Sequence, residues 1–235
     1  MKIRVALTRQ LPIPCDTPDC VVVIDVFRSG TCAASALANG ADSIRMFATV
    51  EDTLAASHAM PTGSFVLAGE RNLMPIAGFH CGNSPRDFAQ QMVNSKTVLM
   101  STTNGSAAVE QYLSAKTLFY AAMCNAKATA EAIAHYAPAE LALICSGTRG
   151  FVSLDDVICA GRIISYLPNA EFADDGAALA SMAHAKYDDP AVFRAEAERF
   201  EGGRRLRGVG LERDLDPCSQ FDIHLFALFF DATRK

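Results

Sequence analysis

The sequence predicts an α/β fold with a three-layer α/β/α arrangement around a mostly parallel or mixed central sheet. Strand-like apolar runs alternate with helical patterns along most of the chain, as in folds built around a parallel sheet. Four of these runs, in VVVIDVFRSGT, FVLAGER, VLMSTTNGS and LALICSGTRG, end in loops of Gly, Ser, Thr, Asn or charged residues. Carboxyl ends of parallel strands share one edge of an open sheet, so we expect these loops to meet there and bind a ligand.

The first half of the chain contains three predicted strands, each followed by a predicted helix. Residues 21–26 form a nearly uninterrupted β-branched run, typical of a strand buried on both faces. Residues 31–39 are rich in Ala and stop before Gly40, which indicates a helix and its end. Next come a strand at 43–48, a helix at 50–60, a strand at 64–68, and a helix that Ser84 and Pro85 begin and that runs to about residue 93.

The alternation continues through the second half. The expected elements are a strand at 97–101, a helix at 105–113, a strand at 117–121, a helix at 125–136, a strand at 141–146, helices at 153–167, 177–186 and 190–200, and a strand-like segment at 223–230. Ser153 with Asp156 has the spacing of a capping box. Gly202 and Gly203 are interpreted as a break after the last helix. No linker is evident, so residues 1–235 are predicted to form one domain.

Composition excludes several classes of function. The net charge of −5 over 235 residues gives no general attraction to nucleic acid or an anionic membrane. No apolar run reaches the length of a membrane span, and the N-terminal apolar stretch is too short for a signal peptide. The eight cysteines form no C-x-x-C pair, which favours reduced, buried thiols and a cytoplasmic protein. A homo-oligomer stays open.

Two acidic–basic pairs follow predicted strands. Asp25 precedes Arg28 by three residues, and Glu70 is next to Arg71. A carboxylate at a strand end can hold a divalent cation, while a nearby arginine can bind phosphate or carboxylate through two hydrogen bonds. The alternative for each pair is a structural ion pair at the junction.

Three further loops carry polar groups suited to anions. Residues 101–106 offer hydroxyl and amide side chains around Gly105, which suit anion binding. The alternative is an ordinary capping loop in which Asn104 is the helix cap. Residues 146–150 resemble an anion-binding loop, and 78–85 could bring backbone near a ligand or form only a tight turn. Residues 203–207 are a basic cluster that could close over a substrate or remain a solvated face.

Common phosphatase and nucleotide-binding signatures are absent. The chain has no P-loop and no G-x-S-x-G elbow. Cys145 and Arg149 have three residues between them and Cys81 and Arg86 have four, whereas a cysteine-nucleophile phosphatase needs five. No D-x-D follows an apolar strand, as a haloacid dehalogenase-type phosphatase requires. The histidines show no zinc-ligand spacing, and an oxygen-preferring ion such as Mg²⁺ suits the carboxylates better.

Taken in order, these segments resemble the 2-phosphosulfolactate phosphatase family over essentially the whole chain. The matching segments are IDVFRSGT, ALANGA, LAGER, GFHCGNSP, STTNGS, CSGTRGFVSLDDVICAG and GGRRLRGVGLERDLDPCSQFD. The resemblance implies a Mg²⁺-dependent hydrolase that converts 2-phosphosulfolactate to sulfolactate and phosphate, a step of coenzyme M biosynthesis. That substrate carries three acidic groups, which agrees with several anion-holding loops. Water would attack phosphorus, with a covalent phospho-enzyme on Asp25 as the alternative.

The predicted site follows from the loops and the resemblance together. The predicted catalytic residues are Asp25, Arg28, Glu70 and Arg71, and the predicted Mg²⁺ ligands are Asp25, Glu70, Asp155 and Asp156, of which Asp156 has the alternative role of cap partner. The predicted substrate-binding residues are Ser29, Thr31, Asn83, Ser84, Thr102, Thr103, Asn104, Gly105, Gly147, Thr148 and Arg149. Two alternatives of another class stay open: a non-catalytic anion-binding protein, and a lyase or isomerase acting on a phosphorylated acid.

Overall fold

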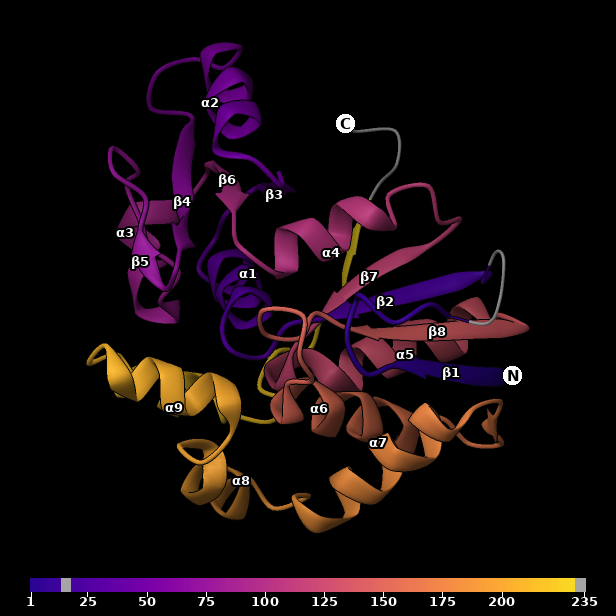
Figure 1. Ribbon diagram of the computed structural model, residues 1–235. Helices are drawn as coiled ribbons and strands as arrows, with labels where there is room; N and C mark the ends of the chain where they lie inside the picture. The colour runs from indigo at the N-terminus through magenta and orange to yellow at the C-terminus, as the bar shows by residue number, and fades with distance from the viewer. Residues whose placement is uncertain (14–17, 231–235) are drawn as a thin grey trace.

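The computed structural model describes residues 1–13 and 18–230, in which the strands form two sheets (Figure 1). The strands are β1 (Lys2–Ala6), β2 (Cys20–Ile24), β3 (Ser43–Met46), β4 (Phe65–Arg71), β5 (Met74–Pro75), β6 (Thr97–Ser101), β7 (Leu118–Ala121), β8 (Glu140–Cys145), β9 (Glu171–Phe172) and β10 (Leu228–Phe230). A six-stranded sheet has the order β10-β7-β2-β8-β1-β9, and a four-stranded sheet has the order β3-β6-β4-β5. All pairings are parallel except β10 with β7 and β5 with β4.

Helices cover the sheets and connect their strands. The α-helices are α1 (Ser29–Ala38), α2 (Val50–His58), α3 (Gln90–Val93), α4 (Gly105–Gln111), α5 (Ala126–Tyr136), α6 (Leu154–Ser165), α7 (Asp175–Lys186), α8 (Pro190–Ala197), α9 (Glu201–Gly208) and α10 (Leu215–Cys218). Three short 3-10 helices are η1 (Pro85–Asp87), η2 (Met123–Asn125) and η3 (Glu212–Asp214). This arrangement confirms the predicted three-layer α/β/α fold class.

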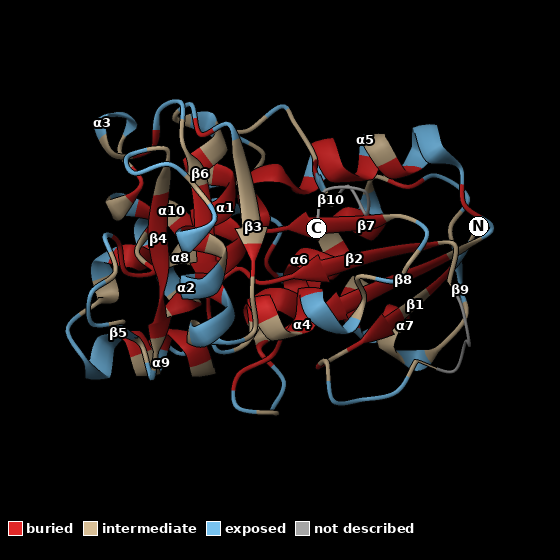
Figure 2. Cartoon of the chain, turned by 90° about the horizontal axis from the view of Figure 1, so that it is seen from above, coloured by how far each residue is buried: buried red, intermediate tan, exposed pale blue. Residues whose placement is uncertain are grey.

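The two faces of β2 contribute to two different hydrophobic cores. All five residues of β2 are buried, and Figure 2 shows it among the most buried strands. Val22 and Ile24 pack in a core with α5, α6 and α7. Val21 and Val23 point to the opposite face, into a second core that includes α1, α4 and the strands of the smaller sheet. Alternation along one strand therefore feeds both cores.

The structure differs from the sequence-based expectation in several places. The helix predicted from Ser84 to about residue 93 is instead the 3-10 helix η1 followed by the short α3, and only Leu228–Phe230 of the predicted strand-like segment at 223–230 form a strand. The strands divide between two sheets, and β1 begins the chain, with Ile3 and Val5 buried between the charged Lys2 and Arg4. The predicted break at Gly202–Gly203 is wrong, because α9 runs through both residues. A Cβ on Gly203 would overlap the Ala197 carbonyl oxygen, so glycine here permits close packing of the helix.

The predicted state of the cysteines is confirmed where the structure describes them. Cys20, Cys32, Cys81, Cys124, Cys145, Cys159 and Cys218 are free and buried, while Cys15 lies outside the described residues. None of the described helices is long and apolar enough to cross a membrane.

Candidate active site

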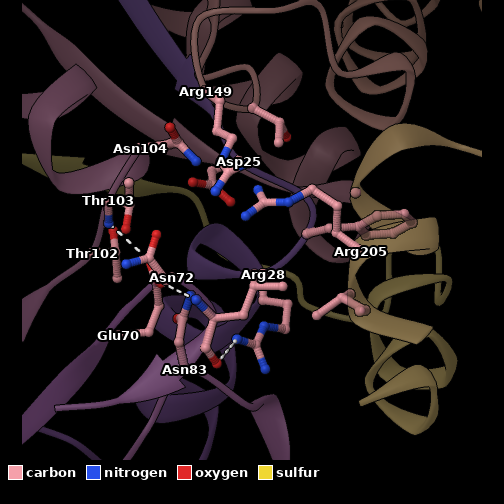
Figure 3. Close-up of a pocket in the computed structure, with 15 residues that line it drawn as sticks. Asp25, Arg28, Glu70, Asn72, Asn83, Thr102, Thr103, Asn104, Arg149 and Arg205 are labelled. Atoms are coloured by element: carbon pink, nitrogen blue, oxygen red, sulfur yellow. Dashed lines mark hydrogen bonds between the residues drawn. The ribbon is translucent and has the colours of Figure 1, made fainter. Parts of the chain in front are cut away.

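One cavity lies where the carboxyl ends of four strands from both sheets converge. Asp25 follows β2, Glu70 lies in β4, Thr102 follows β6, and Thr148 lies in the loop after β8. The cavity encloses about 540 Å³ including its open mouth. Its lining is Asp25, Phe27, Arg28, Glu70, Asn72, Leu73, Asn83, Thr102, Thr103, Asn104, Thr148, Arg149, Gly202, Arg205 and Leu206 (Figure 3). Four loops that are distant in sequence therefore form one site.

Asp25 is the buried carboxylate of this cavity, with 6 % of its surface exposed. Its Oδ1 accepts the Ser29 amide at 3.0 Å, at the start of α1. Its pKa is raised to about 7, mainly by burial and also by the charge of Glu70, while hydrogen bonds from the Ser29 and Gly105 amides and the charge of Arg28 oppose the rise. A carboxyl group in this range can change protonation at neutral pH.

Glu70 fixes two neighbouring loops. Its Oε1 accepts the Thr103 amide at 2.8 Å, and its Oε2 accepts the Leu73 amide at 2.8 Å. One side chain of β4 therefore holds both the loop after β6 and the turn between β4 and β5. Glu70 is 5 % exposed and lines the same cavity as Asp25, and each of its oxygens can accept more than the one hydrogen bond it has.

Arg28 forms a buried ion pair at the wall of the cavity. Its Nη1 donates to Asp214 Oδ2 at 2.6 Å, and the two side chains are only 2 % and 5 % exposed. Ser84 Oγ donates to the other carboxylate oxygen of Asp214 at 2.6 Å. The Arg28 charge is thus balanced within the protein, and the pair joins the start of α1 to η3.

We expect Asp214→Ala to lower the free energy of unfolding by about 3 kcal/mol, because it leaves the Arg28 guanidinium buried without its carboxylate. Urea denaturation monitored by circular dichroism measures the change. Asp216→Ala is the matched control, since its carboxylate is 56 % exposed in its ion pairs, and we expect less than about 1 kcal/mol there. Equal effects of the two substitutions would contradict the structural role of Asp214.

Eight of the predicted site residues do not line the cavity. Most of these support it through local hydrogen bonds. Thr31 Oγ1 donates to the Val26 carbonyl, and Arg71 donates to Glu70 O, Ala48 O, Ser101 O and Ser101 Oγ. The guanidinium of Arg71 therefore ties β4 to neighbouring backbone. The eight residues are Ser29, Thr31, Arg71, Ser84, Gly105, Gly147, Asp155 and Asp156.

Asp155 and Asp156 lie behind Asp25 at the start of α6. Asp156 accepts the Val26 amide at 2.9 Å and the Gly147 amide at 3.0 Å, one with each carboxylate oxygen. The predicted capping box is wrong, because Ser153 makes no side-chain cap hydrogen bond. Asp156 instead joins the loops after β2 and β8.

Three buried carboxyl groups thus lie close enough together to affect one another. The pKa of Asp155 is raised to about 7, mainly by burial and also by the charge of Asp25. Burial also raises the pKa of Asp156 well above its usual value, as do the charges of Asp155 and Asp25. Asp155 Oδ1 is buried without a hydrogen-bond partner. A cation or bound protons are therefore needed to keep this region stable at neutral pH.

A buried hydroxyl network lies beside Asp25 and includes Thr102 of the cavity wall. Ser29 Oγ and Tyr120 Oη are 2.5 Å apart, and Thr102 Oγ1 donates to Ser29 Oγ at 3.3 Å. Thr102 Oγ1 also lies 3.1 Å from Ser106 Oγ, and Ser106 Oγ accepts the Thr102 amide. The side chains of Ser29, Thr102 and Ser106 are thus engaged inside the protein. Sequence reasoning missed Tyr120 because it reads as an ordinary strand residue of β7.

The groups that face the cavity without an internal partner include amide and guanidinium side chains. Asn83 is 6 % exposed, and its Oδ1 is buried without a hydrogen bond. Arg149 and Arg205 form no ion pair with any residue that the structure describes. Sequence reasoning did not select Arg205, and the only signal for it was the basic cluster at 203–207.

Buried carboxylates at the carboxyl ends of parallel strands lie in one cavity with two guanidinium groups that pair with no described carboxylate, an arrangement typical of an α/β enzyme site for a small anion. The chain belongs to the 2-phosphosulpholactate phosphatase family, whose family model matches residues 7–230. It is therefore an enzyme of the phosphoric monoester hydrolase class.

Curated relatives agree with this assignment. A probable 2-phosphosulfolactate phosphatase of Thermosynechococcus vestitus is 33 % identical over 220 residues, covering 90 % of this chain and 89 % of the relative. A protein of Clostridium botulinum with the same description is 35 % identical over 202 residues, covering 84 % and 83 %. One from Cyanothece sp. is 33 % identical over 230 residues, covering 95 % and 93 %.

Proposed function

We propose that this enzyme hydrolyses 2-phosphosulfolactate to sulfolactate and inorganic phosphate with the help of Mg²⁺, as a step of the coenzyme M biosynthesis type. The observation that carries the proposal is one cavity that joins a buried carboxylate, Asp25, to the guanidinium groups of Arg149 and Arg205, neither of which forms an ion pair with a described residue. A substrate with phosphate, carboxylate and sulfonate groups matches this combination of charges. The descriptions of the relatives name the same substrate.

The side chains divide the work within the cavity. Thr103 and Asn104 lie on the loop that Glu70 holds, and they offer polar groups to phosphate oxygens. Asp25, the buried carboxylate of the cavity, accepts the proton of the attacking water, and that proton passes to the leaving oxygen of the substrate, which departs as the alcohol. Arg149 orients the substrate through its acidic oxygens. Phe27, Leu73 and Leu206 border the same space and limit the access of bulk water.

The cavity offers three oxygen-bearing side chains that could hold Mg²⁺. Among the described residues, no group of three or more His, Cys, Asp and Glu side chains is arranged to hold a metal ion. The unpartnered Asn83 Oδ1, however, lines the same cavity as the carboxylates of Asp25 and Glu70. Mg²⁺ in phosphoryl-transfer sites is commonly held by one or two carboxylates together with substrate phosphate and water. We therefore propose Asp25, Glu70 and Asn83 as its protein ligands.

When bound, Mg²⁺ would neutralise charge on the phosphate and on the leaving oxygen. The decisive experiment measures inorganic phosphate released from 2-phosphosulfolactate, with Mg²⁺ and with excess chelator. We expect turnover that depends on Mg²⁺. Saturable binding without turnover would instead identify an anion-binding protein, and substrate loss without free phosphate would identify a lyase or isomerase.

We expect Mg²⁺ to stabilise the protein at pH 8 and to have little effect at pH 5. The pKa values of Asp25 and Asp155 are raised to about 7 in the folded protein, so between about pH 4 and pH 7 the folded state binds more protons than the unfolded state. The stability of the metal-free protein therefore falls as the pH rises through this window. Mg²⁺ offsets that loss only where the carboxyl groups are ionised.

Differential scanning fluorimetry with and without millimolar MgCl₂ at the two pH values measures this difference. Sodium chloride at equal ionic strength is the control for screening. A melting temperature that Mg²⁺ raises equally at pH 5 and pH 8 would contradict binding by these carboxylates.

A further inference from the structure

Arg205 reaches the cavity from a segment far from the four strand-end loops. It lies on α9 next to Leu206, which is only 1 % exposed. Gly202 of the same helix also lines the cavity. Leu206 packs with Ala197 and Leu215 in a small core that contacts Phe27 and Leu73. The helix is thereby fixed against the cavity wall, and the Arg205 side chain points into the space (Figure 3).

The arginines beside Arg205 on the helix have other surroundings. Arg204 pairs with Glu201, and its side chain is 60 % exposed. Arg207 lies 3.5 Å from Glu198, and its side chain is 69 % exposed. Arg205 is less exposed than either and forms no ion pair with a described residue. The helix therefore places one of its three arginines in the cavity and leaves two on the surface.

Arg149 and Arg205 lie close enough to affect one another. Burial lowers the pKa of Arg205, and the charge of Arg149 lowers it further, while Glu201 and Glu70 oppose the change. Glu70 already accepts hydrogen bonds from two backbone amides, and Glu201 pairs with Arg204. Figure 3 shows both guanidinium groups directed to the part of the cavity beside Asp25. Two neighbouring cations of this kind need a ligand with more than one negative group.

We propose that Arg205 is a specificity-determining residue, which together with Arg149 binds the acidic groups that remain on the substrate after its phosphate is removed. The inference rests on the proposed function and deepens it. Arg28 cannot take this role in the same way, because Asp214 already balances its charge. The phosphate has other partners at the loop after β6, where Thr103 and Asn104 line the cavity.

The test compares two esters that differ in the groups next to the phosphate. 2-Phosphosulfolactate carries a carboxylate and a sulfonate, whereas glycerol 2-phosphate carries two neutral hydroxyl groups. For Arg205→Met we expect kcat/KM on 2-phosphosulfolactate to fall about 10- to 100-fold, as the loss of a charge-assisted hydrogen bond implies. On glycerol 2-phosphate we expect a change below about threefold. Arg207→Met is the matched control and is expected to change neither substrate.

An equal loss on both esters would overturn the proposal, because Arg205 would then act on the phosphate or on the fold. No loss on either would overturn it as well. Calorimetric binding of sulfolactate to the wild-type protein and to Arg205→Met separates the proposal from the function itself. If Arg205→Met weakens sulfolactate binding at least tenfold, the role of Arg205 is supported. If in addition no ester is hydrolysed, only the proposed function is overturned. Undetectable binding to wild type, or equal binding to both proteins, would overturn the role of Arg205.

Discussion

Asp25→Asn is expected to lower kcat for phosphate release by at least about 10³-fold while the chain keeps its fold. The substitution removes the ionisable carboxylate of the cavity and with it the proposed proton acceptor and metal ligand. The fold persists because the Asn oxygen can still accept the Ser29 amide that now binds Oδ1. Removal of a buried charge near Glu70, Asp155 and Asp156 also offsets the loss of hydrogen bonding to the second oxygen.

Phosphate release under saturating Mg²⁺ and the far-ultraviolet circular dichroism spectrum together check this prediction. Asp42→Asn is a suitable control, since that residue is exposed and lies outside the cavity, and it should keep full activity. A folded Asp25→Asn enzyme with activity near that of the wild type would remove Asp25 from the chemistry, whether as proton acceptor or as nucleophile.

Gly105→Ala is expected to reduce activity at least about 100-fold and to destabilise the protein by about 3 kcal/mol. A Cβ at this position would overlap Tyr120 Oη and would lie 2.6 Å from both Asp25 Oδ2 and Ser29 Oγ. Those atoms belong to the carboxylate of the site and to the hydroxyl network beside it, so neither can move without displacing Asp25. One methyl group therefore disturbs both packing and catalysis.

Gly208→Ala provides the matched control for this substitution. A Cβ on Gly208, at the end of α9, would meet no atom within 4 Å. Alanine favours a helix over glycine by about 1 kcal/mol, so we expect unchanged activity and equal or higher stability. Urea denaturation and initial rates measure both variants. Retention of wild-type rates by Gly105→Ala would show that Asp25 tolerates displacement and would refute the tight geometry described here.

The sequence could predict the fold class because period and composition are local signals. The buried run at residues 21–26 and the loop residues after each strand are visible without any knowledge of contacts. These same signals identified the four loops, and the structure places residues of all four around one cavity. The division of strands between two sheets was not predictable, because strand order is set by packing between distant segments.

The individual side chains of the site were harder to predict for the same reason. Arg28 and Arg71 look alike in sequence as arginines beside acidic residues, yet one pairs with Asp214 and the other with backbone carbonyls. Gly202 and Gly203 precede Arg205 and suggest a helix break in the sequence. Only the structure shows that they allow α9 to pack closely against Phe27 and Ala197. Such roles depend on partners outside the local pattern: those of Arg28 lie 45 and 186 residues away, and those of Arg71 lie up to 30 residues away.

Asp25 leaves the larger sheet and Glu70 belongs to the smaller one, so no single sheet sets the spacing of the two carboxylates. The apolar core between the sheets, to which Val23, Ala68 and Met100 belong, acts as the spacer. A change of volume there would alter how far apart the reacting groups stand although no substrate ever touches it. Natural selection for turnover should therefore constrain the apolar side chains of this core as strictly as the polar side chains that line the cavity.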